Sequence, residues 1–303
     1  MIRPVWVSGE ALIDLLPGED PNTLRAIVGG GPANTAVALA RLAIPVKFVS
    51  GLSHDRFGQQ ISEQLLANGV GLELAIGSDL PTCLAIVSLD SQGGATYHFH
   101  LKGTATFDFD PELLPDPTRE APSVLHVGTL ATLVEPGASH LLDWANRVGA
   151  YAPVVFDPNI RPSVLSDRSM YASSVERWIE IANVVKVSEE DLRFLFPDRD
   201  FITSARSWLA PSRPLVVVTR GEDGIVGVTS DEIVEVPGVR VVVVDTVGAG
   251  DTVGAVMVEA LTMNNVANLT GELLRTILAR AAKAAAITCS RRGCQPPSSS
   301  ELQ

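Results

Sequence analysis

A run of small residues with an aspartate at each end, residues 245–251 (DTVGAGD), is the part of the sequence best suited to chemistry. It follows an apolar stretch, residues 241–244, that we expect to be a strand, and it precedes a helical pattern over residues 252–262. Gly248 and Gly250 permit unusual backbone angles and let a ligand approach the main chain. Because the first N–H groups of a helix lack partners and lie at its positive end, this turn predicts an anion-binding site suited to phosphate.

Asp251, the last residue of this run, allows two interpretations. It can cap the following helix, a role that contributes ~1 kcal/mol of stability. It can also act as a general base that accepts the proton of an attacking hydroxyl beside a bound phosphate. The spacing alone leaves both open. The run is not a Walker A loop, because no Gly-Lys-Ser/Thr sequence follows it.

A second glycine-rich stretch, residues 29–34 (GGGPAN), also opens a helical pattern. It is either a tight turn that allows close helix packing, or a loop whose exposed backbone and Asn34 amide bind a polyol. The third glycine of the dinucleotide fingerprint G-x-G-x-x-G is missing, so the stretch does not predict a dinucleotide site.

Polar residues follow three of the expected strands. Asp157 and Arg161 follow one, and they are either ligand contacts or an ion pair at the strand end. Thr219 and Gly221 end another, where an ordinary turn through Gly224 is the alternative to a ligand site.

The third of these segments is residues 186–191 (KVSEED), whose carboxylates also suit a solvated helix start. The small-residue pattern over residues 281–286 predicts close helix packing.

Short apolar runs alternate with longer helical patterns, which predicts βαβ units and an α/β fold with a doubly wound, mainly parallel sheet flanked by helices. The expected strands are residues 5–8, 46–49, 124–127, 154–157, 184–187 and 215–219. The expected helices include residues 33–42, 57–68, 137–148 and 189–196. In such a sheet the carboxyl ends of the strands face the ligand crevice.

Residues 83–89 and 95–101 have no helix between them, and the turn-forming residues 90–94 predict a β-hairpin. Residues 13–16 can add a strand to it. We expect this small β-sheet, over about residues 10–18 and 83–107, to project from the main body and cover the site as a lid. Phe99 would give the lid an apolar wall against the ligand.

Composition narrows the possible function classes. The formal net charge of −12 argues against a non-specific nucleic-acid binder. No apolar run reaches the ~20 residues that span a bilayer, the N-terminus lacks signal-peptide features, and the three cysteines form no disulfide framework. We therefore expect a cytoplasmic protein that binds neither nucleic acid nor membrane. The Pro/Ser-rich residues 295–303 predict a disordered end.

Residues 30–34 (GGPAN) and 245–251 (DTVGAGD) resemble the two signatures of the ribokinase/PfkB carbohydrate kinases, and the resemblance extends over nearly the whole chain. Residues 8–14 (SGEALID) resemble the opening of the bacterial fructokinases of that family. Residues 157–161 (DPNIR) and 219–224 (TRGEDG) also occur in the expected order. The resemblance implies one ribokinase-like kinase domain over residues 1–303 that uses ATP and Mg²⁺ to phosphorylate a hydroxyl.

The resemblance also implies roles for individual residues. Asp251 would be the base, and the N–H groups of Gly248, Ala249 and Gly250 would stabilise the transferred phosphoryl group. The sugar would be held by Asp14, Gly30, Gly31, Asn34 and Arg161. The nucleotide would be contacted by Lys186, Ser188, Thr219, Gly221, Gly224, Gly248, Gly250 and Lys283.

Two ion sites follow from the same resemblance. Where the family often has an Asn-x-x-Glu motif that binds Mg²⁺ through water, this sequence offers Ser188 and Asp191, with Glu190 as a substitute carboxylate. Asp245, Val247 and Gly293 resemble a loop that binds a monovalent cation, here K⁺.

Among the family's activities the resemblance favours a fructokinase, which converts fructose and ATP to fructose 6-phosphate and ADP. The alternatives are a kinase for another sugar or a nucleoside, such as 2-keto-3-deoxygluconate, ribose or aminoimidazole riboside, and a non-catalytic sugar-binding regulator. The exposed hairpin predicts a homodimer joined through the lid.

Overall fold

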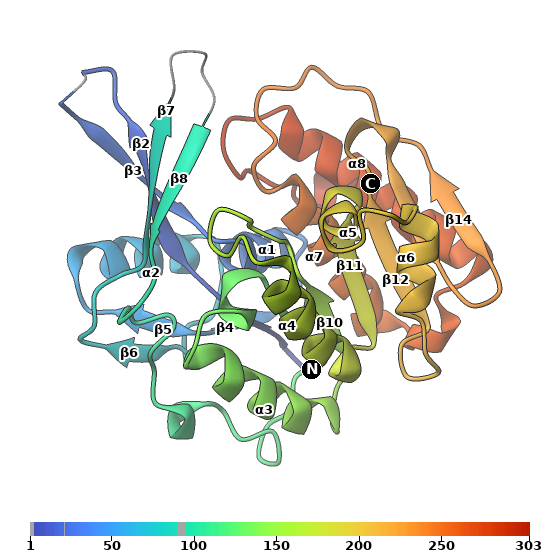
Figure 1. The fold of residues 1–303 in the computed structure, drawn as a ribbon, viewed down its shortest axis with the longest axis horizontal. Helices are drawn as coiled ribbons and strands as arrows, with labels where there is room; N and C mark the ends of the chain where they lie inside the picture. Colours follow the sequence, from blue (N-terminus) through green and yellow to red (C-terminus); the bar gives the residue numbers. More distant parts are fainter. Residues whose placement is uncertain (1–2, 21, 90–94) are drawn as a thin grey trace.

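The computed structural model describes residues 3–20, 22–89 and 95–303, and its largest element is an eight-stranded sheet (Figure 1). The strand order is β14-β13-β12-β11-β10-β9-β1-β4. Strand β13 pairs antiparallel with both β12 and β14, and the other neighbouring strands are parallel. The bounds are β1 (Val5–Ser8), β4 (Val46–Val49), β9 (Leu125–Gly128), β10 (Val154–Asp157), β11 (Val184–Ser188), β12 (Leu215–Thr219), β13 (Ile225–Val228) and β14 (Ile233–Val236).

Helices cover both faces of this sheet, so every residue of β1, β9 and β10 is buried. One face carries α1 (Gly31–Arg41), α7 (Ala249–Met263) and α8 (Gly271–Cys289). The other carries α3 (Gly137–Gly149), α4 (Arg168–Ile181), α5 (Glu189–Leu195) and α6 (Phe201–Ser207). The predicted α/β class with a doubly wound, mainly parallel sheet is confirmed.

A smaller four-stranded sheet stands away from the main one, at the upper left of Figure 1. Its order is β3-β2-β7-β8, with bounds β2 (Leu12–Pro17), β3 (Leu24–Gly29), β7 (Leu84–Leu89) and β8 (Ala95–His100). The predicted hairpin arms are β7 and β8, while its turn at residues 90–94 lies outside the described residues. Strand β3 was not predicted, because its sequence LRAIVG lacks a strict apolar alternation.

Below the smaller sheet lies α2 (Arg56–Ala67), whose Ile61 and Leu65 share one apolar core with Leu15 and Ala26. A two-stranded sheet of β5 (Gly51–Ser53) and β6 (Ile76–Ser78) lies beside it. Short 3₁₀ helices occupy η1 (Pro111–Leu113), η2 (Thr129–Thr132), η3 (Gly221–Asp223), η4 (Val266–Asn268) and η5 (Ser299–Leu302). Among the described helices, none combines the length and the apolar character that crossing a bilayer requires.

Three local expectations are wrong. Residues 241–244 form no strand but an irregular segment with Val242 84% exposed, which the Val244 N–H anchors to the Cys289 carbonyl. Helix α7 starts at Ala249, earlier than expected, because the turn before it ends at Gly248. The C-terminal end is ordered as η5, because Leu302 is buried in the core and Ser298 caps the helix with Glu301.

Candidate active site

The predicted phosphate-binding turn lies at the start of α7. Gly248 is its N-cap, with a left-handed φ of 81°, and it makes no side-chain cap hydrogen bond. A Cβ at Gly248 would lie 2.2 Å from the Cys294 sulfur, so only glycine fits there. The first hydrogen bond of the helix runs from the Thr252 N–H to the Gly248 carbonyl, while the Ala249 N–H closes the turn onto Thr246 at 3.3 Å. The first turn of α7 therefore presents a positive helix end to a ligand.

Asp251 lies in this first turn but does not cap it. Its Oδ2 accepts a 2.8 Å hydrogen bond from the Asn34 side-chain amide, and the residue is only 8% exposed. Burial raises its pKa above the ordinary value, although Lys186 and the Asn34 hydrogen bond oppose the shift. Of the two interpretations left open by the sequence, the geometry supports a base, because a raised pKa makes the carboxylate a better proton acceptor.

The second glycine-rich stretch starts α1 and meets Asp251. Gly30 is the N-cap of α1 with a φ of 107°, and a Cβ there would lie 2.4 Å from the Glu10 carbonyl oxygen. A Cβ at Gly31 would lie 3.2 Å from Asp251 Oδ1 and 3.1 Å from the side-chain amide nitrogen of Asn159. The starts of α1 and α7 therefore lie against each other around one carboxylate.

A buried ion pair lies beside the same helix start. Lys186 Nζ is 2.9 Å from Asp157 Oδ2, and both side chains are buried. A Cβ at Gly250 would lie 3.0 Å from that ammonium, so glycine leaves room for it. Burial lowers the pKa of Lys186, but Asp157 and Asp251 outweigh this and raise it above its usual value. Asp157 thus pairs with Lys186, and the alternative of an Asp157–Arg161 pair at the strand end is wrong.

The residues expected to hold Mg²⁺ do not converge on the α7 start. Asp191 Oδ1 accepts the Ile160 N–H at 2.9 Å and Oδ2 accepts the Ser188 N–H at 3.1 Å, while the Ser188 hydroxyl caps α5. Burial and then Asp157 raise the pKa of Asp191. Both Asp191 oxygens are thus bonded to backbone N–H groups, whereas the exposed Glu190 carboxylate is open to solvent and stays the predicted candidate for a water-mediated metal contact. Within the described residues, no group of three or more His, Cys, Asp or Glu could hold a metal ion.

The expected monovalent-cation loop is brought together by Asp245. Its Oδ1 accepts the Val247 N–H at 3.1 Å and its Oδ2 accepts the Gly293 N–H at 2.8 Å. The N–H groups of Val244 and Asp245 also reach the Cys289 carbonyl. The turn before α7 and the loop after α8 are thus bound to each other.

A cavity of about 820 Å³ opens beside the α7 start, at the carboxyl end of β12. It contains Thr219, Gly221, Gly224, Ala249 and Gly250 of the predicted residues. Its other walls, not predicted as site residues, include Val239, Val241, Val243, Ala282, Ala285, Ala286 and Cys289.

Lys283, Lys186 and Ser188 do not line this cavity. Lys283 was expected beside the nucleotide, but its Nζ donates to a Gln303 main-chain oxygen at 3.3 Å. The alanines of α8 form the wall instead, because Ala282, Ala285 and Ala286 lie on the cavity side of the helix. In this structure Lys283 thus lies outside the cavity, and its contact with a nucleotide stays a prediction.

The smaller sheet brings Asp14 and Phe99 to one face. Asp14 pairs in register with Ala85, and Ala85 with Phe99, so the three side chains point the same way. Burial raises the pKa of Asp14 to about 6, and the charge of Arg161 opposes this shift. The Arg161 side chain is exposed and donates to the Ile160 carbonyl at 3.1 Å. The same charge also opposes the raised pKa of Asp251, so Arg161 lies near both carboxylates of the expected sugar site.

Three residues near this site were not predicted. Glu10 is buried, Thr129 packs against Gly31, and Asn159 has a left-handed φ of 38° with its amide beside Gly31. Two of them could have been predicted from their place in the sequence. Asn159 follows strand β10 and Thr129 follows β9, at the ligand-facing edge of the sheet.

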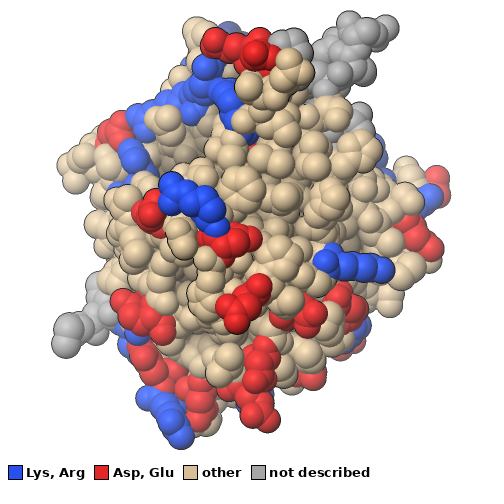
Figure 2. Space-filling view, turned by 90° about the vertical axis from the view of Figure 1, so that its left-hand side faces the viewer, with Lys and Arg blue, Asp and Glu red and all other residues tan. Residues whose placement is uncertain are grey.

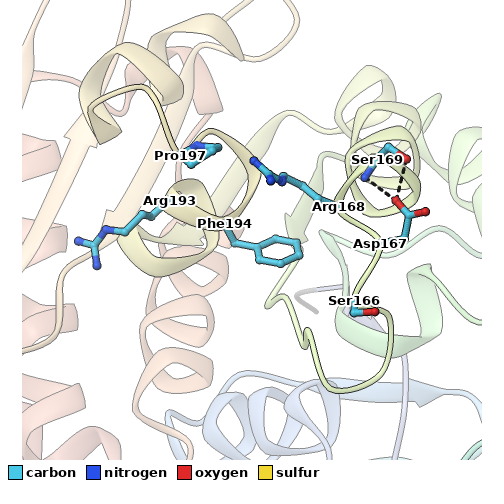
Figure 3. Close-up of a pocket in the computed structure, with 7 residues that line it drawn as sticks. All are labelled: Ser166, Asp167, Arg168, Ser169, Arg193, Phe194 and Pro197. Atoms are coloured by element: carbon cyan, nitrogen blue, oxygen red, sulfur yellow. Dashed lines mark hydrogen bonds between the residues drawn. The ribbon is translucent and has the colours of Figure 1, made fainter.

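A second cavity, of about 620 Å³, lies away from this site between the start of α4 and α5 (Figure 3). It is lined by Ser166, Asp167, Arg168, Ser169, Arg193, Phe194 and Pro197. The Asp167 carboxylate caps α4 by accepting the Ser169 N–H at 2.9 Å, as the dashed lines in Figure 3 show. The residues that line it do not pair a base with a free helix start, so we assign it no reaction.

A parallel sheet with a base, a free helix start and a cavity at its carboxyl edge is the arrangement of a small-molecule kinase. The chain belongs to the pfkB family of carbohydrate kinases, whose model matches residues 5–301. Membership makes it a phosphotransferase that acts on a hydroxyl group, as expected from the sequence.

Relatives and solved structures agree with this class. A fructokinase from Rhizobium leguminosarum bv. trifolii is 36% identical over 260 residues, or 85% of this chain and 79% of that protein. An Escherichia coli fructokinase is 30% identical over 100% of this chain and 99% of its own length. The structure is also similar to a fructokinase from Xylella fastidiosa with bound ATP, with a TM-score of 0.91, 28% identity and coverage of 100% and 97% of the two chains. A fructokinase from Vibrio cholerae O395, bound to fructose, ADP and a potassium ion, gives a TM-score of 0.86 at 26% identity, covering 99% of this chain and 97% of that one.

Proposed function

We propose that this protein is an ATP-dependent fructokinase that phosphorylates the 6-hydroxyl of fructose. The observation that carries the proposal is the position of Asp251, which follows Gly250 of the nucleotide-sized cavity and whose carboxylate meets Gly31 and Asn34 at the start of α1. Relatives and similar structures named as fructokinases support fructose as the acceptor.

In the proposed reaction, the acceptor hydroxyl gives its proton to Asp251 as its oxygen attacks the terminal phosphorus of ATP. Asn34 holds the carboxylate in place through the 2.8 Å hydrogen bond. The N–H groups at the α7 start and the Lys186 ammonium stabilise the charge on the transferred group. ADP leaves through the cavity lined by Thr219 and Gly221.

Mg²⁺ would enter with ATP and neutralise its phosphates. Glu190 would contact the ion through water, while the Asp191 oxygens are already bonded to backbone N–H groups. K⁺ would be held by Asp245, Val247 and Gly293, and its support is a similar fructokinase structure solved with potassium. We expect the reaction to take place in the cytoplasm.

The smaller sheet would close over the sugar as a lid and join two copies of the chain. Ile27 pairs in register with Asp14 and is 38% exposed, so an apolar side chain lies on the sugar-facing side of the sheet. Figure 2 faces the outer side of the molecule, at the left of Figure 1, and shows Lys and Arg at its upper left, a mostly uncharged middle, and Asp and Glu gathered lower down. Light scattering at micromolar concentration should give twice the chain mass, and a monomeric mass would contradict the dimer.

A panel of acceptors tests the proposed activity. Purified protein with ATP, Mg²⁺ and K⁺ is offered fructose, ribose, 2-keto-3-deoxygluconate and aminoimidazole riboside, and ADP release is measured. We expect fructose to give the highest kcat/KM. Turnover of ribose or a nucleoside without turnover of fructose would refute fructose as the substrate. Sugar binding without any turnover would support a regulator.

A further inference from the structure

Glu10 lies between β1 and β2 and is 2% exposed, although it is a carboxylic acid. Both of its oxygens are engaged by one short segment after β9. The Thr129 hydroxyl donates to Oε1, and the Ala131 N–H donates to Oε2 at 3.2 Å. The helix η2 that begins there has Gly128 as its N-cap and no side-chain cap of its own. Glu10 therefore caps η2 from outside.

Thr129 has a backbone conformation that needs such support. Its φ is 57°, in the left-handed region that a β-branched residue rarely adopts. Such a conformation costs free energy and persists only where the surrounding structure imposes it. The Glu10 carboxylate bonds both the side chain of Thr129 and the turn that follows it, so it supplies that constraint.

The consequence reaches the base. A Cβ at Gly31 would lie 2.9 Å from the Thr129 methyl carbon and 3.2 Å from Asp251 Oδ1. Thr129 and Asp251 thus both lie against the side of Gly31 where a Cβ would stand. Glu10 also contacts this stretch directly, because its carbonyl oxygen is 2.4 Å from a Cβ position on Gly30.

We propose that Glu10 is a positioning residue that holds Thr129 against Gly31 and so shapes the acceptor-binding side of the Asp251 site. This inference rests on the proposed kinase function. It assigns Glu10 no contact with the nucleotide, since Glu10 does not line the 820 Å³ cavity.

The environment of Glu10 makes its effect depend on pH. Burial raises its pKa to about 7, against the lowering effects of Thr129, Ala131 and Arg161. The other titratable groups that face it are Tyr171, with a pKa raised by burial to about 12, and Cys83, whose pKa burial also raises. Both are neutral near pH 7, so Glu10 is the member that titrates there. Its carboxylate accepts both bonds above pH 7, whereas the protonated acid can no longer accept both.

The test is Glu10→Gln, which keeps the size of the side chain but cannot accept two bonds and does not titrate. We expect its KM for the sugar to rise about tenfold, the equivalent of one buried hydrogen bond, with the KM for ATP unchanged. The wild-type KM for the sugar should begin to rise as the pH falls through 7. In Glu10→Gln this step near pH 7 should vanish, and only the step near pH 6 expected from Asp14 should remain.

Thr129→Val gives an independent measurement, because it keeps the shape and removes the hydroxyl that Glu10 binds. The double variant should be no worse than either single variant, since both remove the same interaction. Glu259→Gln is the matched control: Glu259 is a buried carboxylate bonded to Arg280 at the far side of α7, and its loss should lower the Tm without a change in either KM.

Three results would overturn the inference. These are an unchanged sugar KM in both Glu10→Gln and Thr129→Val, an equal rise in the KM for sugar and ATP, or a pH step near 7 that survives in Glu10→Gln. If Glu10→Gln does not fold, Thr129→Val alone decides by its sugar KM. If the proposed kinase function is wrong, the wild type itself will show no turnover. The sugar Kd measured by calorimetry then replaces the KM in each comparison.

Discussion

Replacing Asp251 by asparagine separates its chemical role from its structural one. The Asp251→Asn variant should fold like the wild type, because the oxygen of the new amide can still accept the 2.8 Å hydrogen bond from Asn34. The Lys186 ammonium keeps Asp157 as its partner at 2.9 Å, so the variant leaves no unpaired buried cation. What disappears is the oxygen that can take a proton.

The expected loss follows from that single change. Removal of a general base costs roughly 10²–10⁴-fold in kcat, and we expect the upper part of this range because burial raises the pKa of Asp251 and makes it a stronger base than a free carboxylate. Coupled ADP release with fructose gives kcat and KM, and calorimetry with ATP gives the nucleotide Kd. The ATP Kd should stay within about threefold of the wild-type value, because it depends on the helix start and the cavity, which are unchanged.

Asp167→Asn is the matched control, because it makes the same substitution at another helix start. Asp167 caps α4, away from the site. It should lose at most ~1 kcal/mol of stability and no activity. If Asp251→Asn behaved in the same way, with slightly lower stability and near-normal turnover, Asp251 would be a structural residue and the proposed mechanism would be wrong.

Three further variants test the surroundings of Asp251. Lys186→Met leaves the buried Asp157 unpaired, which costs about 3–5 kcal/mol; thermal unfolding should show this loss, and Lys186→Met with Asp157→Asn should regain stability but not activity. Gly248→Ala places a Cβ 2.2 Å from the Cys294 sulfur and should lower the free energy of unfolding by more than Gly103→Ala, where φ is also positive but the space is open; equal losses in urea titrations would contradict the clash. Since burial raises the pKa of Asp14 to about 6, kcat/KM for the sugar should fall as the pH drops below 6, and a fall of the same size in Asp14→Asn would rule out Asp14 as its cause.

Six strands of the main sheet and its mainly parallel class could be predicted from sequence, because each of these strands is a short apolar, β-branched run that needs cover on both faces. The same reasoning placed the turn before α7 at the ligand edge, and the structure puts Gly248 there with a φ of 81°. It failed at residues 241–244, which have the composition of a strand but lie in the open, with Val242 84% exposed. A β-branched composition shows that a segment can form a strand. It does not show whether a partner strand lies beside it, and among the described residues none pairs with this segment.

The residues missed around the site depend on contacts between distant parts of the chain. Glu10 and Thr129 are 119 positions apart, and neither has a local pattern that marks it. The family resemblance, and no local pattern, marked Asp191 as a metal ligand, whereas its carboxylate accepts the Ile160 N–H from the segment after β10. The contact of Lys283 could not be predicted either, because its partner is the main-chain oxygen of Gln303, 20 positions further along the chain. Sequence spacing therefore located the site but not the partners of its buried charges.

The pairing with Asp157 explains how the Lys186 ammonium can lie beside the positive, N-terminal end of α7. An ammonium beside the first turn of α7 is repelled by the positive helix end, and Gly250 lets it come close. Asp157 and Asp251 keep Lys186 charged despite its burial. In the proposed mechanism, the helix start and the ammonium would both attract the transferred phosphate, which would offset the repulsion between them. Charge stabilisation is thus built into the fold before the substrate arrives, and Asp251 is left to take the proton.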